Sequence, residues 1–287
     1  MNKYRFTLRL RSGTTFDYSG SPLDVERSRN VRCTLRLRSG HERTLNGVET
    51  YLIVFFLLCF SCNDGLFDSG TTITREIEIN EGFSRIDIEN IFDIVLVQDT
   101  INKALVTCGR NLQPYVSIGV KDSILTLAQD TKFNWSRKYE RIKLELHLIK
   151  VAEVNIHKPI SLKSIGVLKG NTFKLMDWNQ VSEVDLALDY HSVGVYMVSD
   201  NFGRYHLKGK CFSAYFEGWG SCQVMADSLV VSTYCFVKHR GMGDVYVNVN
   251  GQLGISLEFT GNVYYTGNPT QITITQQTST GRLIKMN

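Results

Sequence analysis

Several features of enzymes and metal-binding proteins are missing from this sequence of 287 residues. It contains no Gly-rich phosphate loop, no Gly-x-Ser-x-Gly motif and, after Cys62, no Cys-x-x-Cys pair. The histidines that follow Cys62 have no metal-ligand spacing. We therefore expect no catalytic residues, no metal ion and no cofactor.

An excess of charge is also missing from most of the chain. Residues 1–61 contain ten Lys/Arg and five Asp/Glu, whereas the remainder contains 22 basic and 23 acidic residues. The formal net charge of +4 therefore comes from the N-terminal part. The nearly neutral remainder lacks the excess of basic residues that binds the phosphates of DNA or RNA, so we expect no nucleic-acid partner.

What the sequence does contain is a repeat of about 20 residues in its C-terminal half. Two tracks of apolar residues recur at this period, each on a short segment in which apolar and polar residues alternate. The first track is Leu175, Val195, Phe216, Val237 and Leu257. The second track is Val184, Tyr205, Val224, Val245 and Val263. Repeats of this kind bury a continuous core only by stacking on one another.

The repeat predicts an all-β fold, a right-handed parallel β-helix or β-solenoid, over residues 151–287. Residues 73–150 also alternate between apolar and polar positions and show no sustained helical period. They predict an N-terminal β-strand-rich cap region. A cap is needed because an uncovered coil exposes unpaired backbone groups at its edge.

Residues 51–62 are uncharged, strongly hydrophobic and end in Ser61-Cys62. The run is shorter than the roughly 20 residues that span a bilayer, but it has the length of a signal-peptide core. A small residue before cysteine is typical of a bacterial lipoprotein signal, in which the cysteine becomes acylated. Cys59 and Phe60 depart from the usual box, and the alternative is a buried strand ending in an ordinary cysteine. We expect lipidation at Cys62.

The segments on either side of this run have simpler interpretations. Residues 63–72 are polar enough to form a tether. Residues 1–50 contain the same seven letters twice, at 7–13 and 34–40. We interpret them as a non-native leader, translated from repetitive DNA upstream of the true start codon. A basic surface-binding arm is the alternative.

Residues beside the inward tracks should face outward and stack in columns about 4.8 Å apart. The column beside the second track reads Asp185, His206, Met225, Tyr246 and Tyr264. Rings and thioethers on an outer face are typical of a platform for a glycan or protein ligand. We therefore select His206, Met225, Tyr246 and Tyr264 as the candidate binding surface. The alternative is that a loop, the cap or a second copy in a homo-oligomer covers them.

The column beside the first track reads Met176, Tyr196, Glu217, Lys238 and Glu258. Glycoside hydrolysis requires two carboxyl groups that face a common cleft. Here the charges of Glu217, Lys238 and Glu258 alternate in sign. We therefore predict a surface ion-pair ladder rather than a catalytic pair.

Four cysteines follow Cys62, namely Cys108, Cys211, Cys222 and Cys235. In an oxidising envelope they could pair in three ways. Cys235 aligns with Ala214 one coil earlier, which favours a buried apolar role for its side chain.

The order of several segments resembles the putative auto-transporter adhesin family with the head GIN domain. These segments are residues 81–90, 92–99, 111–116, 125–127 and 261–269. The resemblance covers about Glu76 to Lys285. The sequence departs from the family pattern at residues 177–179 and 200–202, which stand in place of Gly-Ser-Gly turns. The resemblance implies β-solenoid coils, a secreted or lipid-anchored envelope protein of a Gram-negative bacterium, and no catalytic residues.

Together these patterns predict a lipid-anchored cell-envelope protein that presents a β-solenoid interaction surface, without enzymatic activity. Its place would be the outer membrane, facing the periplasm or the cell surface. The expected partners are the membrane, through the anchor, and a glycan or protein ligand. A polysaccharide-active parallel β-helix enzyme and a purely structural envelope component are the alternatives.

Overall fold

The computed structural model describes residues 69–130, 141–198 and 200–286, together with the backbone of four earlier strands. The chain divides into two compact units, Met1–Asp68 and Ser69–Asn287. In the first unit, strands β1 (Phe6–Leu10), β2 (Thr15–Tyr18), β3 (Val31–Arg36) and β4 (Glu42–Thr44) form an antiparallel sheet in the order β2-β1-β3-β4. The predicted signal core 51–62 and Cys62 lie outside the described residues.

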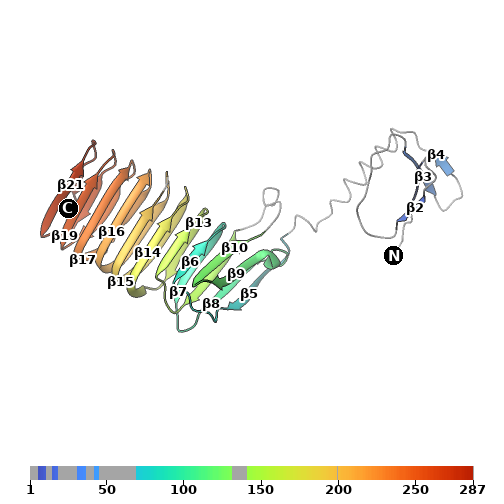
Figure 1. Ribbon diagram of the computed structural model, residues 1–287, viewed down its shortest axis with the longest axis horizontal. Helices are drawn as coiled ribbons and strands as arrows, with labels where there is room; N and C mark the ends of the chain where they lie inside the picture. The colour runs from blue at the N-terminus through green and yellow to red at the C-terminus, as the bar shows by residue number, and fades with distance from the viewer. Residues whose placement is uncertain are drawn as a thin grey trace. The chain divides into compact units, whose positions relative to one another are not determined.

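The second unit is an all-β solenoid of stacked parallel strands, as the repeat predicted (Figure 1). Its described part contains no α-helix, and no helix in it is long and apolar enough to cross a membrane. The long strands bend, so that one strand contributes to more than one column of pairings. They are β14 (Leu168–Asp177), β15 (Ser182–Met197), β16 (Arg204–Gly220) and β17 (Gln223–Gly241).

Two parallel ladders run the length of the solenoid. The first ladder contains β10 (Ile124–Gln129), β6 (Arg85–Ile88), β12 (Glu153–Ile156), the C-terminal parts of β14 to β17, β19 (Gln252–Leu257) and β21 (Gln271–Gln277). The second contains β11 (Ile142–Leu148), β7 (Phe92–Gln98), β13 (Ile160–Ile165), the N-terminal parts of β15 to β17, β18 (Val245–Val249), β20 (Val263–Thr266) and β22 (Leu283–Lys285).

The coils do not stack in chain order at the N-terminal end. Strand β6 pairs with β10 on one side and β12 on the other, and β7 lies likewise between β11 and β13. The coil formed by β10 and β11 is therefore outermost, although it comes later in the sequence. The solenoid thus extends into residues 73–150.

Three antiparallel strands cover the outermost coil. Strand β9 (Val116–Lys121) pairs with β10, β8 (Lys103–Gly109) pairs with β11, and β5 (Thr72–Glu78) pairs with β8. The turn between β9 and β10 uses Asp122 and Ser123, with φ of 51° and 61°, which suits a tight hairpin. A short 3-10 helix, η1 (Gln113–Tyr115), precedes β9.

Alternation along the strands builds the core. Every residue of the predicted second track is buried, because alternate side chains of a strand point to the same face. The first track is confirmed up to Val237, but the next residue in register is Ile255, not Leu257. The last full coil is shorter than the average repeat. Leu257 is nevertheless buried, because a shift of two residues keeps a side chain on the same face.

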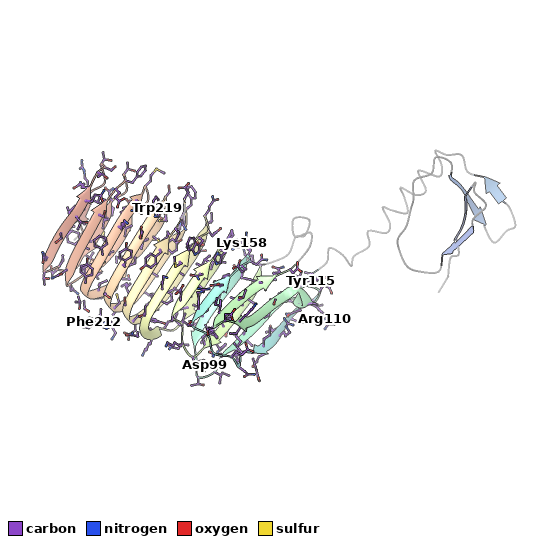
Figure 2. All side chains as sticks on the ribbon, in the orientation of Figure 1. Asp99, Arg110, Tyr115, Lys158, Phe212 and Trp219 are labelled. Atoms are coloured by element: carbon purple, nitrogen blue, oxygen red, sulfur yellow. The ribbon has the colours of Figure 1, made fainter. Side chains whose placement is uncertain are left out.

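The turns that lead from the first ladder to the second stack along one long edge of the solenoid, which we call edge A. It is formed by residues 89–91, 157–159, 178–181, 198, 200–203, 219–222, 242–244 and 258–262. Backbone hydrogen bonds link these turns from coil to coil, for example from Phe202 N to Gln180 O and from Met242 N to Gly220 O. The opposite long edge, which carries Phe212 and Asp99, we call edge B (Figure 2).

Candidate binding surface

The predicted column beside the second track is in register on the outer face of the second ladder. Asp185 lies opposite His206, and His206 opposite Met225. Met225 lies opposite Tyr246, and Tyr246 opposite Tyr264. His206 is exposed and the three following side chains are partly exposed. The structure therefore brings the four selected residues together as neighbours.

The two tyrosines of this column stack on each other. Their ring centroids are 4.8 Å apart and the ring planes differ by 10°. Burial, together with the nearby Asp244 carboxylate, raises the pKa of Tyr246. Because the facing ring surfaces are already in contact, a ligand meets the ring edges, the outer ring faces and the hydroxyl groups. The surface is therefore suited to hydrogen bonding as well as to apolar contact.

A second row of stacked rings lies on the outer face of the first ladder. Tyr196 and Tyr215 have centroids 5.3 Å apart, and Tyr215 and Phe236 have centroids 5.7 Å apart. Tyr196 folds over the backbone of Gly194, which has no Cβ to obstruct the ring. The sequence analysis placed Tyr196 in the column beside the first track but missed Tyr215 and Phe236, because their register position is that of Gly194, two residues before Tyr196. Their aligned spacing of 21 residues was the available signal.

An ion-pair network adjoins this row, and it differs from the predicted ladder. Lys238 lies opposite Ser256, not Glu258, because the last coil is shorter. Arg240 instead joins the two acids, with Nη1 at 3.0 Å from Glu217 Oε1 and Nε at 2.8 Å from Glu258 Oε2. Lys238 Nζ is 3.5 Å from Glu217 Oε1. The predicted pair of Glu217 with Lys238 is confirmed, but the link to Glu258 is made by Arg240 and not, as predicted, by Lys238.

The pKa of Glu258 follows from this network. Burial alone would raise the pKa of Glu258, but hydrogen bonds from Arg240 and Ser256 outweigh it and lower the pKa. Arg240 also lies over the Trp219 ring at 4.6 Å from its centroid. The neighbouring cation thus favours the ionised form of Glu258. A glycosidase acid, in contrast, requires a raised pKa.

A buried polar cluster lies inside edge A. Asp177, Asn201 and Tyr205 have no exposed surface. The Tyr205 hydroxyl donates to Asp177 Oδ2 at 2.6 Å, and Asn201 Nδ2 donates to the Tyr205 oxygen at 2.8 Å. Burial raises the pKa of Asp177 despite these bonds. The cluster is closed to solvent, so it supports the bend of the chain rather than contacting a ligand.

The four cysteines after Cys62 are free and buried, which corrects the expectation that they could form disulfides. Cys235 lies opposite Ala214 and is fully buried, as its alignment predicted. Burial raises the pKa of Cys211 and of Cys222 to about 12. These thiols are core residues with little thiolate character at neutral pH.

One group of potential metal ligands occurs among the described residues. Oxygen and nitrogen ligand atoms of Asp87, Glu89 and His157 lie within 4.8 Å of one another. Asp87 is already engaged by Arg85 at 3.0 Å and by Asn155 at 2.9 Å, and His157 lies 3.6 Å from Glu89. The group is therefore a set of paired surface charges. Histidine spacing in the sequence did not indicate it, because its members come from adjacent coils.

The fold and these outer columns define a β-solenoid with aromatic side chains on both outer ladders. The family described as "Putative auto-transporter adhesin, head GIN domain" matches residues 82–269. The chain belongs to this family, as the resemblance of its segments predicted. No curated protein matches the chain.

Solved structures share the fold. A putative adhesin from Bacteroides fragilis is 17% identical, with a TM-score of 0.64 over 75% of this chain and 97% of its own. A putative adhesin from Parabacteroides distasonis is 18% identical, with a TM-score of 0.54 over 76% and 98%. Another protein of that species, described as a putative lipid binding protein, is 17% identical, with a TM-score of 0.52 over 76% and 98%.

Proposed function

We propose that this protein is a non-enzymatic adhesin of the Gram-negative cell envelope, anchored in the outer membrane by acylation of Cys62. Its solenoid displays a binding surface for a glycan or protein ligand at His206, Met225, Tyr246 and Tyr264. The observation that carries the proposal is the in-register column, in which Tyr246 and Tyr264 stack at 4.8 Å with partly exposed rings. Membership of the adhesin family supports it.

A role without catalysis is supported by the ion pairs of two acidic residues on the outer face of the first ladder. Glu217 and Glu258 share Arg240, so neither is free to act as a proton donor or nucleophile. The cysteine thiols are buried. An activity screen on acidic and neutral polysaccharides tests this point, and turnover that is lost in Glu217→Gln would contradict it.

The binding surface is tested by replacing Tyr246 and Tyr264 together with Ser, then measuring binding to a glycan array and to host-cell surfaces. We expect binding to fall at least about tenfold, since aromatic anchors contribute the most to interfaces. The matched control is Tyr196→Ser with Tyr215→Ser on the other ladder. Equal binding by both double variants and the unaltered protein, with the circular dichroism spectrum unchanged, would remove this surface from consideration.

The anchor is tested in a Gram-negative host by metabolic labelling with a fatty acid. We expect label on the full chain and none on Cys62→Ser, which should leave the membrane fraction. A labelled Cys62→Ser variant, or an unlabelled native chain, would contradict the anchor.

A further inference from the structure

The C-terminal end of the solenoid leaves core positions uncovered. Strand β21 pairs with β19, with Leu253 opposite Ile272 and Ile255 opposite Ile274. Leu253 and Ile255 are buried, whereas Ile272 and Ile274 are 41 and 47% exposed. Partners in a parallel ladder point to the same face of the sheet, so the two isoleucines continue the inward column of the first ladder. They occupy core positions that no further described coil covers.

The second ladder ends in the same way at β22. Leu283 lies opposite Val263, so it continues the second track, and its side chain is only partly buried. Among the described strands, none pairs with the outer edge of β21 or of β22. This end therefore exposes apolar core side chains beside a row of unpaired backbone donors and acceptors. Such an edge is a template for another β-strand.

The other end of the solenoid is closed by strands β5, β8 and β9 (Figure 1). Strand β8 places Val106 opposite Leu144, and β9 places Val120 opposite Leu125. Leu125 and Leu144 of the outermost coil are buried as a result. In the described part of the chain, an uncovered core position is thus a feature of the C-terminal end.

The edge of β21 also lacks the charges that usually protect an exposed strand. Its sequence from Gln271 to Gln277 contains only Gln, Ile and Thr, with no Lys and no Pro. Its first four residues pair with β19 in unbroken register. Strand β22, in contrast, is shorter and ends in Lys285. Two copies of β21 can therefore meet without bringing like charges together.

A second copy of this end supplies the missing cover. Two β21 strands related by a twofold axis perpendicular to the sheet run antiparallel and form a self-complementary contact. Such an axis keeps inward side chains on the inward face, so Ile272 and Ile274 of both copies point into one continuous core. The N-terminal end of another copy offers no such core position, because its outermost coil is already covered.

We propose that the protein forms a tail-to-tail dimer, in which the C-terminal ends of two solenoids meet and their β21 strands pair antiparallel. The backbone groups at the edge of each copy then bond to those of the other. The uncovered isoleucines become part of a shared core. A contact of this kind is isologous, so it closes after two copies and does not extend into a fibre.

The dimer changes how the proposed binding surface is displayed. The twofold axis leaves the outer faces of the second ladders on the same side, so the two columns that contain Tyr264 lie on one face. Tyr264 lies opposite Ile284 of β22, the last strand of this ladder. A ligand with repeated units can then contact both columns, which raises its avidity. This consequence rests on the proposed function, whereas the dimer itself does not.

Sedimentation velocity on residues 69–287, over a range of protein concentrations, measures the oligomeric state. This compact unit contains every described core residue. Solved relatives match 75 and 76% of the chain over 97 and 98% of their own length, so a unit of this size folds alone. We expect an equilibrium between monomer and dimer, without larger species.

A matched pair of isoleucine variants locates the contact. Ile274 in β21 is 47% exposed, and Ile165, at the end of β13 and away from the C-terminal coil, is 60% exposed. We expect Ile274→Glu to raise the dissociation constant of the dimer at least about tenfold, because each copy would bury a carboxylate in the interface. Ile165→Glu should leave it unchanged. Circular dichroism checks that both variants keep the fold.

Crosslinking tests the geometry without altering either isoleucine. The native cysteines of residues 69–287 are buried, so an introduced cysteine supplies the accessible thiol. Thr273→Cys lies on the outer face of β21, and a short bismaleimide should join two copies through it. The control is Gly119→Cys in β9 at the capped end, where an added Cβ meets no atom within 4 Å. We expect it to remain uncrosslinked under the same treatment.

Three results overturn the proposal. The first is a monomer at all concentrations up to about 100 μM. The second is equal weakening of the dimer by Ile274→Glu and Ile165→Glu. The third is crosslinking of Gly119→Cys as efficient as that of Thr273→Cys, or a growing series of oligomers, since both indicate head-to-tail stacking. These measurements use no glycan or cell surface, so a failure of the dimer is distinguishable from a failure of the proposed function.

Discussion

The Tyr205 hydroxyl donates a hydrogen bond of 2.6 Å to Asp177 Oδ2, and both side chains are wholly buried. Tyr205 belongs to the second inward track, whereas Asp177 ends a strand of the first ladder one coil earlier. Their contact links the two ladders at the bend of edge A. A buried carboxylate of this kind persists only because several donors satisfy it.

Replacing Tyr205 with Phe removes the donor to Asp177 and the acceptor of Asn201 while keeping the ring. We expect the free energy of unfolding to fall by about 1–3 kcal/mol, because buried polar groups lose their partners. Urea denaturation of residues 69–287 measures the change. Tyr264→Phe, in which the hydroxyl is lost from a partly exposed ring, serves as the control and should change stability by less than about 0.5 kcal/mol. Equal effects of the two variants would contradict the role of the cluster.

Asp177 should also make stability depend on pH. Its pKa is raised by burial above the ordinary value of 3.8, so the folded protein binds this proton more tightly than the unfolded chain. The resulting stabilisation is complete below the unfolded pKa and is lost as the pH rises through the folded pKa. We expect Asp177→Asn to remove this loss of stability with rising pH. Unfolding free energies measured from acidic to neutral pH should therefore fall less steeply in the variant, and parallel profiles would refute the assignment.

Arg240 joins Glu217 and Glu258 across two coils, and all three side chains are only 21 to 26% exposed. We expect Arg240→Gln to lower the free energy of unfolding by about 1 kcal/mol or somewhat more, because two partly buried pairs are lost together. The difference should shrink at high salt concentration. A double-mutant cycle with Glu258→Gln checks the coupling. Additive effects in that cycle would show that the pair contributes nothing.

Replacing either of two glycines with Ala should change the stability of the solenoid in different ways. Gly209 has a φ of 114°, and an added Cβ would overlap the carbonyl oxygen of Leu188 in the adjacent coil. We expect Gly209→Ala to destabilise the solenoid by roughly 1–3 kcal/mol or more. At Gly119 in β9 nothing lies within 4 Å of an added Cβ, so Gly119→Ala should be neutral or slightly stabilising. Thermal unfolding of the two variants measures the contrast, and a stable Gly209→Ala would contradict the stacked register.

The alternation of apolar residues was sufficient to predict the solenoid and most of its core. Val184, Tyr205 and Val224 could be assigned inward positions because side-chain direction along a strand follows from local geometry. The same regularity aligned Met225, Tyr246 and Tyr264 in one outer column. These features repeat at short range, so one sequence is enough to detect them.

Other features depend on how coils of unequal length pack. The coil of β10 and β11 lies outside that of β6 and β7, because β10 pairs with the free edge of β6 and β11 with the free edge of β7. The order of the strands in the sequence does not predict this arrangement. Arg240 reaches Glu258 because the last coil is shorter, which shifts the register by two residues. Trp178, Phe202 and Met242 have no common spacing in the sequence. They share an edge because hydrogen-bonded turns of different lengths stack on one another, which is a property of the folded coils and not of any segment alone.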